Sequence, residues 1–450
     1  MRMVRLSELD AGHGTLTAWR LSGTASAPLS PAPPAHNQEL RLQQAAYERA
    51  EQGNWSRRWH LTAFHLDGPL APGPLEDALA DFVRRHSTLR SRFSAEGHTF
   101  VRRVMPPAAV SLSRLDLGVC PDSEAARAAL VHLADEGTDP LGRYPCVFAA
   151  LSGPHGTTVF MAADHLHVDM HSHVVAVEEI HRLYEARLRG TDAGLPVPGD
   201  HVEFALAERA RDADDVDAAL AHWVAFARAA GDRLPTFPLD LGVAPGEDVP
   251  LTQELLPLFD EETADAVESW CWANGGMFLP GLLAAAALTV VELGGSGAFR
   301  TIIPMQTRPD PKAPAVGWYV NGVPIAFDVP EGAGLDLVVR RAQAAFLEVR
   351  RLRDAPIERI QRLMPSDIRQ DRASWFSYLD LRGGRGPWDP RRQARVTSSA
   401  RNGGGGDVWI NRTPDGTVLQ ARYPDVPAAR AAMRAYRAGI ARHLTAAVGR

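Results

Sequence analysis

The sequence predicts an α/β protein built from two lobes, and three observations lead to this prediction. The chain has 450 residues, which exceeds the size at which one hydrophobic core usually stops growing. Short apolar runs typical of buried strands alternate along the chain with longer amphipathic patterns typical of helices. Residues 190–200, GTDAGLPVPGD, have no periodicity and combine glycine with proline, as linkers do. We therefore expect an N-terminal lobe of residues 1–195 and a C-terminal lobe of residues 196–450.

Composition places the chain among folded globular proteins. Hydrophobic residues make up 45% and charged residues 23% of the chain, and the formal net charge is −6. A nucleic-acid binder usually carries a basic excess, so nucleic acid is not an expected partner. The three cysteines contain no CxxC pair, which argues against a disulfide framework and against a zinc knuckle. The opening segment MRMVRLSELDAGHGTL lacks an apolar run, and no stretch approaches the roughly 18 apolar residues of a membrane span. We expect a cytoplasmic protein.

The N-terminal half alternates helical and extended patterns. HNQELRLQQAAYERA is helical, WHLTAFHL alternates at period two before the turn at Asp67-Gly68, and a helix is expected from Pro74 to His86. The apolar runs 147–151 and 157–163 predict two buried strands, and HSHVVAVEEIHRLYEARLRG predicts a helix. The segment DHLHVDM therefore lies between a strand and a helix.

The C-terminal half repeats this mixture. We expect long helices near residues 201–230, 260–272 and 279–292, strands at TIIPM and YVNGVPIAFDV, and a helix over 335–352. SWFSYLDL is expected to be a strand, and an amphipathic helix closes the chain. Residues 382–406 are dense in Arg and Gly without a core pattern, which predicts a long exposed loop.

The segment DHLHVDMHSH carries groups suited to acid–base chemistry. Histidine titrates near neutrality, so His165 can take a proton from an attacking hydroxyl or amine and return it to a leaving group. Asp169, four residues later, can hold the local geometry through a charged partner. A turn between strand and helix can aim such a ring into a cleft. His165 is therefore the candidate general base.

The same segment also permits a metal interpretation. His165, His167, Asp169, His171 and His173 alternate, and an extended backbone would place them on one face. Such groups bind zinc, and the run approaches the HxHxDH signature of metallo-β-lactamase-like hydrolases. Met170 breaks that spacing, and a helix starting near His171 would separate the last two histidines. We expect no metal.

Four further segments, in order, resemble the blocks of condensation domains. They are RRHSTLRSRF (84–93), DPLGRYPCVFAAL (139–151), IPMQTRPDPKAPAVGWYVNGVPIAFDV (303–329) and RTPDGTVLQARYPD (412–425). The segment DHLHVDM resembles the HHxxxDG motif of the same family. With these blocks the resemblance covers nearly the whole chain, and it identifies a free-standing member of the condensation-domain superfamily of acyltransferases.

The resemblance implies an α/β (α+β sandwich) fold of two chloramphenicol-acetyltransferase-like lobes in a V-shaped pseudo-dimer, with a tunnel between them. In that family the motif's second histidine, matched by His165, promotes attack of an amine or hydroxyl on a thioester. The motif's aspartate, matched by Asp169, is structural and pairs with the arginine of the "GR" block, matched by Arg308. Asn321, in the same block, is expected to support the site.

The resemblance also implies the setting of the reaction. No bound cofactor is expected, because the acyl donor is presented on the phosphopantetheine of a carrier protein or on coenzyme A. The expected partners are therefore an acyl or peptidyl carrier protein and a small acceptor, and the protein itself is expected to be a monomer. The implied product is an amide or ester in specialised metabolism of the non-ribosomal peptide type, such as antibiotic biosynthesis. An acidic carrier could dock on the arginines of 340–353.

Two positions depart from the HHxxxDG pattern. Asp164 replaces the first histidine, a position of support in the family, so we expect Asp164→Ala to have a mild effect. Met170 replaces glycine, and its side chain would narrow the route of the donor.

Two other functions remain open at this point. Asp164, Asp169 and Ser172 match DxxxxDxxS, the pattern of heterocyclization domains, in which Asp164 and Asp169 would be catalytic. A catalytically silent domain that recruits other enzymes is the second alternative.

Overall fold

The chain divides into two compact units. The computed structural model describes residues 1–97, 99–154, 156–211, 213–244, 247, 249–370, 373–382, 394–398 and 406–449. The first unit comprises Met1–Arg211, Arg308–Tyr319 and Gly383–Arg401, and the second comprises Asp212–Thr307, Val320–Arg382 and Asn402–Arg450. The first unit thus extends beyond the boundary expected near residue 195. The reason lies in α5 (His201–Arg209), whose Phe204 packs in one buried cluster with Ala35, Ala315 and Tyr319 of the same unit.

The first unit is built on a seven-stranded sheet. Its strands, in spatial order, are β1 (Arg2–Met3), β13 (Arg395–Ser398), β3 (Trp59–Leu66), β8 (Gly156–Asp164), β7 (Cys146–Gly153), β2 (Gly14–Leu21) and β6 (Leu112–Cys120). All neighbours are antiparallel except β1 and β13. A separate hairpin consists of β4 (Ser91–Glu96) and β5 (Thr99–Val104). The central strands β3, β8 and β7 are buried, which explains their apolar sequences.

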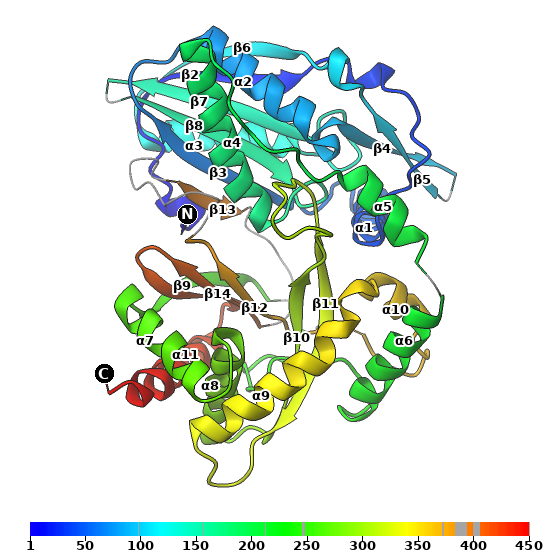
Figure 1. Cartoon of the computed structure of the whole chain (residues 1–450), viewed down its shortest axis with the longest axis vertical. Helices are drawn as coiled ribbons and strands as arrows, with labels where there is room; N and C mark the ends of the chain where they lie inside the picture. Colours follow the sequence, from blue (N-terminus) through cyan, green and yellow to red (C-terminus); the bar gives the residue numbers. More distant parts are fainter. Residues whose placement is uncertain are drawn as a thin grey trace. The chain divides into compact units, whose positions relative to one another are not determined.

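Helices cover both faces of this sheet. On one face, α3 (Ser123–Gly137) packs against alternate residues of the central strands, including Ala149 and Phe160. On the other face lie α2 (Pro72–Arg85) and α4 (Met170–Arg189), side by side, and Phe148 contacts Phe82 of α2 there (Figure 1). This alternation follows from the period of two in strands. The unit also contains α1 (His36–Gln52) and short 3-10 turns at Leu6–Glu8, Thr24–Ser26, Ser87–Arg90 and Pro107–Ala109.

The second unit is also α/β. A four-stranded sheet has the order β12 (Phe376–Asp380), β14 (Asp407–Thr413), β15 (Gly416–Pro424) and β9 (Leu251–Phe259), and β10 (Ala298–Gln306) pairs with β11 (Val320–Asp328). The helices are α6 (Ala213–Arg228), α7 (Glu261–Ala273), α8 (Phe278–Glu292), α9 (Leu335–Val349), α10 (Ile357–Leu363) and α11 (Pro427–Ala447), with a 3-10 turn at Arg350–Asp354. One large apolar cluster of buried residues joins these sheets and helices. The predicted mixed α/β class is confirmed.

Two predicted elements differ in the structure. The helix expected over residues 201–230 is divided into α5 and α6, which belong to different units. The loop expected over residues 382–406 contains β13, whose Arg395–Ser398 pairs with β3 and whose Val396 is buried. Backbone pairing across the sheet, which leaves little trace in sequence periodicity, accounts for this strand. The remaining residues of that prediction, 383–393 and 399–405, lie outside the described residues.

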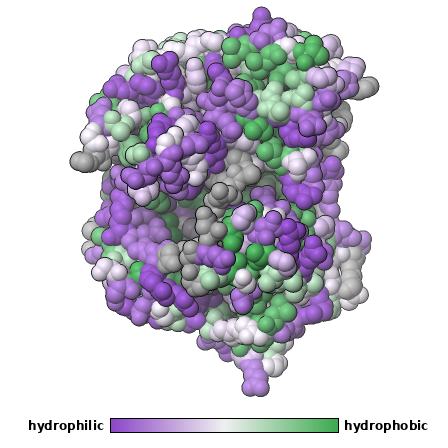
Figure 2. Space-filling model, turned by 180° about the vertical axis from the view of Figure 1, so that it is seen from behind, coloured by the Kyte–Doolittle hydropathy of each residue, from purple (hydrophilic) through white to green (hydrophobic). Residues whose placement is uncertain are grey.

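The visible surface is mostly hydrophilic, with smaller hydrophobic areas (Figure 2). Within the described part of the chain, no single helix is long and apolar enough to cross a membrane. Among the described helices, one pair, α7 and α8, is long and apolar enough for a membrane span when the two are taken together, but they meet at a bend of 92°.

Candidate active site

The segment singled out in the sequence lies between β8, which ends at Asp164, and α4, which begins at Met170. Asp169 is the N-cap of α4, and its Oδ1 accepts the backbone N–H of Ser172 at 2.9 Å. The first N–H groups of a helix lack partners within the helix, so a carboxylate at this position stabilises the helix start. Aspartate at residue 169 therefore sets where α4 begins.

Asp169 also forms the buried ion pair expected from the resemblance. Nη2 of Arg308 lies 2.7 Å from Oδ1 of Asp169, and both side chains are almost completely buried. The backbone N–H of Tyr319 donates to the other carboxylate oxygen at 3.1 Å. Charged hydrogen bonds of this kind offset the cost of burying a carboxylate.

The same contacts fasten residues 308–319 beside the start of α4. Nη2 of Arg308 donates to the carbonyl of Ala315 at 3.0 Å, and its guanidinium stacks over the ring of Tyr319 at 4.7 Å. Oγ of Ser172 accepts the N–H of Gly317 at 3.1 Å. Ser172 is thus part of the packing between two segments that lie far apart in sequence.

The charge state of Asp169 follows from these partners. Burial acts to raise the pKa of Asp169, but the guanidinium of Arg308 and the hydrogen bonds from Arg308 and Ser172 lower it well below its usual range. Asp169 is therefore a carboxylate at all physiological pH values, and it is a poor proton acceptor.

Asp164 forms a second buried ion pair, which the sequence did not predict. Nε and Nη2 of Arg41, in α1, lie 3.1 Å and 2.8 Å from the two carboxylate oxygens. Oδ1 of Asp164 also accepts the N–H of Leu166 at 2.9 Å, and Arg41 donates to the carbonyl of Ser56 at 2.8 Å. Such a two-pronged pair positions the backbone directly before His165. The expectation that Asp164→Ala is mild disagrees with this geometry.

His165 follows Asp164 and is only half-buried. Its backbone N–H donates to the carbonyl of Arg58 at 2.8 Å. Its ring stacks on Trp318, with centroids 4.3 Å apart and planes 36° apart, and lies 5.0 Å from the ring of His60. These two ring neighbours, an indole and a second imidazole, restrict the orientation of the His165 ring.

His167 has different surroundings. It is buried, its Nδ1 lies 3.0 Å from the carbonyl of Thr88, and its ring contacts Phe93. Burial lowers the pKa of His167 to about 4, so this histidine is neutral at pH 7 and donates to a carbonyl. The two histidines of the motif therefore contact different groups.

His60 was not predicted as a site residue, and His173 was named only in the metal interpretation, although both lie near His165. The ring of His173 lies 5.4 Å from that of His60, and its Nδ1 lies 2.5 Å from Oγ1 of Thr62. Burial lowers the pKa of His173 to about 4. The period of two along β3 places His60 and Thr62 on the strand face opposite Leu61 and Ala63, and this pattern was the available signal.

The two remaining predicted residues, Met170 and Asn321, lie in different elements. Met170 is the first residue of α4 and is half-buried. Asn321, in β11 of the second unit, donates to the carbonyls of Arg353 and Ala355 at 2.8 Å and 2.6 Å and accepts the N–H of Ile357 at 2.8 Å. Asn321 thus fixes the turn between Arg350–Asp354 and α10.

The histidine-rich run does not form a one-sided array in the structure. The strand ends at Asp164, and His171 and His173 belong to α4, where successive residues point in different directions. Among the described residues, no group of three or more His, Cys, Asp or Glu side chains is arranged to hold a metal ion.

Comparison with known proteins agrees with this architecture. The family model for the condensation domain matches residues 42–379. Acyltransferase PapA3 of Mycobacterium tuberculosis (strain ATCC 25618 / H37Rv) is 26% identical over 96% of this chain and 93% of its own length. Trehalose-2-sulfate acyltransferase PapA2 of Mycobacterium bovis (strain BCG / Pasteur 1173P2) is 28% identical over 92% of this chain and 91% of its own length.

Solved structures show the same fold. The structure of PapA2 acyl transferase superimposes with a TM-score of 0.87 at 24% identity and covers 100% of both chains. The X-domain from teicoplanin biosynthesis gives a TM-score of 0.67 at 18% identity and covers 93% of this chain and 95% of that domain. The family match spans most of the chain, and the curated relatives align along nearly all of it. The protein therefore belongs to the condensation-domain family and is an acyltransferase of that family.

Proposed function

We propose that the protein transfers an acyl group from a thioester to a hydroxyl of a small acceptor, with His165 as the general base. One observation carries the assignment of the base. Of the acid–base side chains in Asp164–Asp169, only that of His165 is not fully buried, and both carboxylates are in ion pairs with arginines. A base must reach its substrate, and a carboxylate held by a guanidinium accepts protons poorly.

In the proposed reaction His165 first accepts a proton and then donates it. The neutral imidazole takes the proton of the acceptor hydroxyl while its oxygen attacks the thioester carbonyl, forming a C–O bond. The tetrahedral intermediate then collapses, the C–S bond breaks, and the imidazolium returns the proton to the leaving sulfur. The products are an ester and a free thiol. Stacking on Trp318 and the backbone bond to Arg58 hold the imidazole in position for both transfers.

For the acceptor we favour a sugar hydroxyl, and hence an ester product. The support comes from the names of the relatives, which include a trehalose-2-sulfate acyltransferase and a 2'-acyl-2-O-sulfo-trehalose (hydroxy)phthioceranyltransferase. This proposal departs from the peptide-type metabolism expected from the sequence, because these named activities concern sugars.

For the donor we retain an acyl thioester on the phosphopantetheine of a carrier protein or on coenzyme A. The arginines of 340–353 are a weaker docking surface than the sequence indicated, because several have acidic neighbours. Arg340 lies 2.9 Å from Asp336, and Arg351 lies 3.9 Å from Glu348. Met170→Gly tests whether the methionine narrows the donor route, because it should then raise the rate with bulky donors.

We do not propose heterocyclization. That function needs Asp164, Asp169 and Ser172 to act on substrate, yet all three are buried and engaged by Arg41, Arg308 or the backbone of Gly317. A silent recruitment domain remains the competing outcome of the experiment below.

The test is direct assay with defined substrates. The purified protein is incubated with acyl-coenzyme A or acyl-carrier donors and with trehalose, trehalose 2-sulfate or glucosamine, and products are followed by mass spectrometry. We expect an ester on a sugar acceptor from the wild type and from His132→Ala, a control on the exposed surface of α3. His165→Ala should yield little product. Absence of product from the folded wild type with every pair would overturn acyl transfer and favour the recruitment domain.

A further inference from the structure

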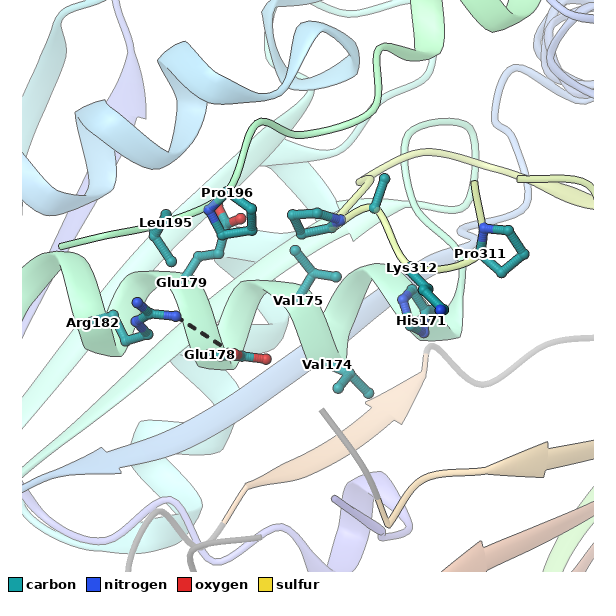
Figure 3. Close-up of a pocket in the computed structure, with 12 residues that line it drawn as sticks. His171, Val174, Val175, Glu178, Glu179, Arg182, Leu195, Pro196, Pro311 and Lys312 are labelled. Carbon is teal, nitrogen blue, oxygen red and sulfur yellow. Dashed lines mark ion pairs between the residues drawn. The ribbon is translucent and has the colours of Figure 1, made fainter. Parts of the chain in front are cut away.

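A groove in the first unit lies outside the contacts of His165 described above. It has a volume of about 560 Å³, within the range of small-molecule sites. Its walls come from one face of α4, from the linker at Leu195 and Pro196, and from residues 311–314 (Figure 3). Both α4 and the segment 308–319 also bear residues of the candidate active site, so the groove shares two of its walls with that site.

The acidic side chains of the groove are already paired. Glu179 binds Arg85 and His86, with its Oε2 2.9 Å and 3.0 Å from their nitrogens. Glu178 lies 3.9 Å from Arg182, whose Nη2 also donates to the carbonyl of Ala193 at 2.7 Å. These acids therefore add little free negative charge to the groove.

Lys312 differs from the other charged groups of the groove. It is exposed, and no carboxylate among the described residues lies within ion-pair distance of its ammonium. His171, in the first turn of α4, also lines the groove, and Figure 3 draws it at the same end as Lys312. Lys312 is also the only lysine in the chain, against 48 lysine and arginine residues together. The groove thus has at one end an ammonium with no described carboxylate at ion-pair distance, and the nearby Asp310 accepts the backbone N–H of Lys312 at 2.8 Å through its Oδ1.

The rest of the groove is largely apolar. Val174 and Val175 of α4 line it together with Leu195, Pro196 and the prolines of residues 311–314, and in Figure 3 Val175 points toward Pro196. A groove with a cation at one end and apolar walls is complementary to a molecule that has an anionic head and an alkyl part. A compact ammonium is suited to a tetrahedral oxyanion in a site open to water.

We propose that this groove binds the sulfate or phosphate ester of an acylated substrate, with the anionic group at Lys312 and His171 and the alkyl part along Val174 and Val175. The inference rests on the proposed function and deepens it, because it names the substrate class as an anionic amphiphile. The relatives' names supply one such molecule, an acylated sugar sulfate. A phosphate ester offers the same chemistry from another source.

Because Lys312 is the only lysine, its amine can be followed individually. The full-length protein is treated with a low concentration of the N-hydroxysuccinimide ester of acetate, and acetylation is quantified by peptide mass spectrometry. Octyl sulfate and octyl phosphate, below their micellar concentrations, should each slow acetylation of Lys312 at least fivefold, while the N-terminal amine reacts as before. The ratio of the Lys312 acetylation rates with the two probes shows whether the sulfate or the phosphate ester is preferred. Neutral octyl glucoside should not protect, and equal protection by it would overturn the role of charge.

Binding is then measured by calorimetry with matched variants. Lys312→Met should weaken binding of the preferred octyl ester about tenfold, and Lys312→Glu more strongly. Arg189→Met, which removes an exposed cation at the far end of the same helix, should bind like the wild type. Equal affinity of Lys312→Met and the wild type would overturn the inference.

These readouts need no turnover, so they separate the inference from the proposed function. Protection and binding without any acyl transfer would support the groove and contradict the proposed function. Acyl transfer to a neutral sugar, without protection of Lys312 or charge-dependent binding, would support the proposed function and contradict the groove.

Discussion

Two buried ion pairs flank the loop that carries His165, and they are built differently. Asp169–Arg308 joins the start of α4 to a segment 139 residues away, and the same carboxylate also caps the helix and binds the backbone of Tyr319. Asp164–Arg41 joins the end of β8 to α1, and its carboxylate binds one further N–H, that of Leu166. The first pair organises two segments and a helix start, whereas the second fixes one strand end.

The comparison shows that neighbouring carboxylates of one motif can have separate structural tasks. Each pair holds one end of the segment 165–168, so the backbone of His165 is fixed from both sides along the chain. Breaking either pair should leave a buried charge without a partner, and the penalty should grow with the number of contacts that are lost.

The largest effect is expected for Asp169→Ala. It removes the partner of Arg308, the cap of α4 and the acceptor of the Tyr319 N–H, so the free energy of unfolding should fall by about 4–5 kcal/mol. Urea unfolding followed by circular dichroism measures this loss. Asp169→Asn keeps part of the cap and should lose less. A loss below about 1 kcal/mol for Asp169→Ala would contradict the organising role of this pair.

Asp164→Ala should follow, with a loss of about 3 kcal/mol, because Arg41 would remain buried and unpaired. This prediction replaces the mild effect expected from the resemblance. The double variant Arg41→Met with Asp164→Leu should recover much of the loss, since it removes both charges. If the double variant is less stable than Asp164→Ala, the penalty does not come from an unpaired charge.

Stability should also fall as the pH is lowered from 7 towards 4. Burial lowers the pKa of His167, His173 and His201 to about 4, about 4 and about 3, below the ordinary value near 6.5. The unfolded chain therefore binds more protons in this range, and the stability that is complete above pH 6.5 is lost as pH falls through the folded values. Between pH 7 and pH 4 each histidine contributes up to about 3 kcal/mol. Urea midpoints at pH 7, 6 and 5 measure this trend, which should be shallower in His173→Gln. A flat profile would contradict it.

A smaller effect is expected for Arg102→Met. Arg102 is fully buried like Arg41 and Arg308, but no described carboxylate pairs with it; it donates to Gln38 and to the carbonyl of Pro33. Burial lowers the pKa of Arg102 to about 9, which reflects the cost of that charge. Replacing it should change the free energy of unfolding by less than about 2 kcal/mol. If Arg102→Met lowers the free energy of unfolding as much as Asp164→Ala does, the carboxylate partners of Arg41 and Arg308 do not explain the difference from Arg102.

The sequence predicted the parts of this region that depend on local pattern or on a family motif. Apolar runs predicted β8, the amphipathic pattern predicted α4 to within one residue at its start, and the resemblance identified Arg308 as the partner of Asp169. Arg41 was missed because it lies 123 residues before Asp164 and belongs to no quoted motif. Arg41 is buried because α1 packs against the rest of the first unit, and the helical pattern of α1 does not reveal which of its polar residues will be buried.

The same distinction explains the errors in the fold. The periodicity of residues 201–230 is helical throughout, but it does not reveal that α5 packs in the first unit and α6 in the second. The four residues of β13 are too few for a period to be recognised, and their pairing with β3 is a long-range contact. Patterns of neighbouring residues predict elements, whereas the partners of those elements depend on the whole fold.

The most direct test of the account is the single-turnover rate of acyl transfer by His165→Ala. We predict that the rate falls by about 10²- to 10⁴-fold, the usual contribution of a positioned base, while the urea midpoint stays at the wild-type value. Imidazole added to the assay should restore part of the rate. His132→Ala, measured in parallel, should match the wild type. A rate for His165→Ala equal to that of the wild type with the same substrates would contradict the assignment of His165 as the base.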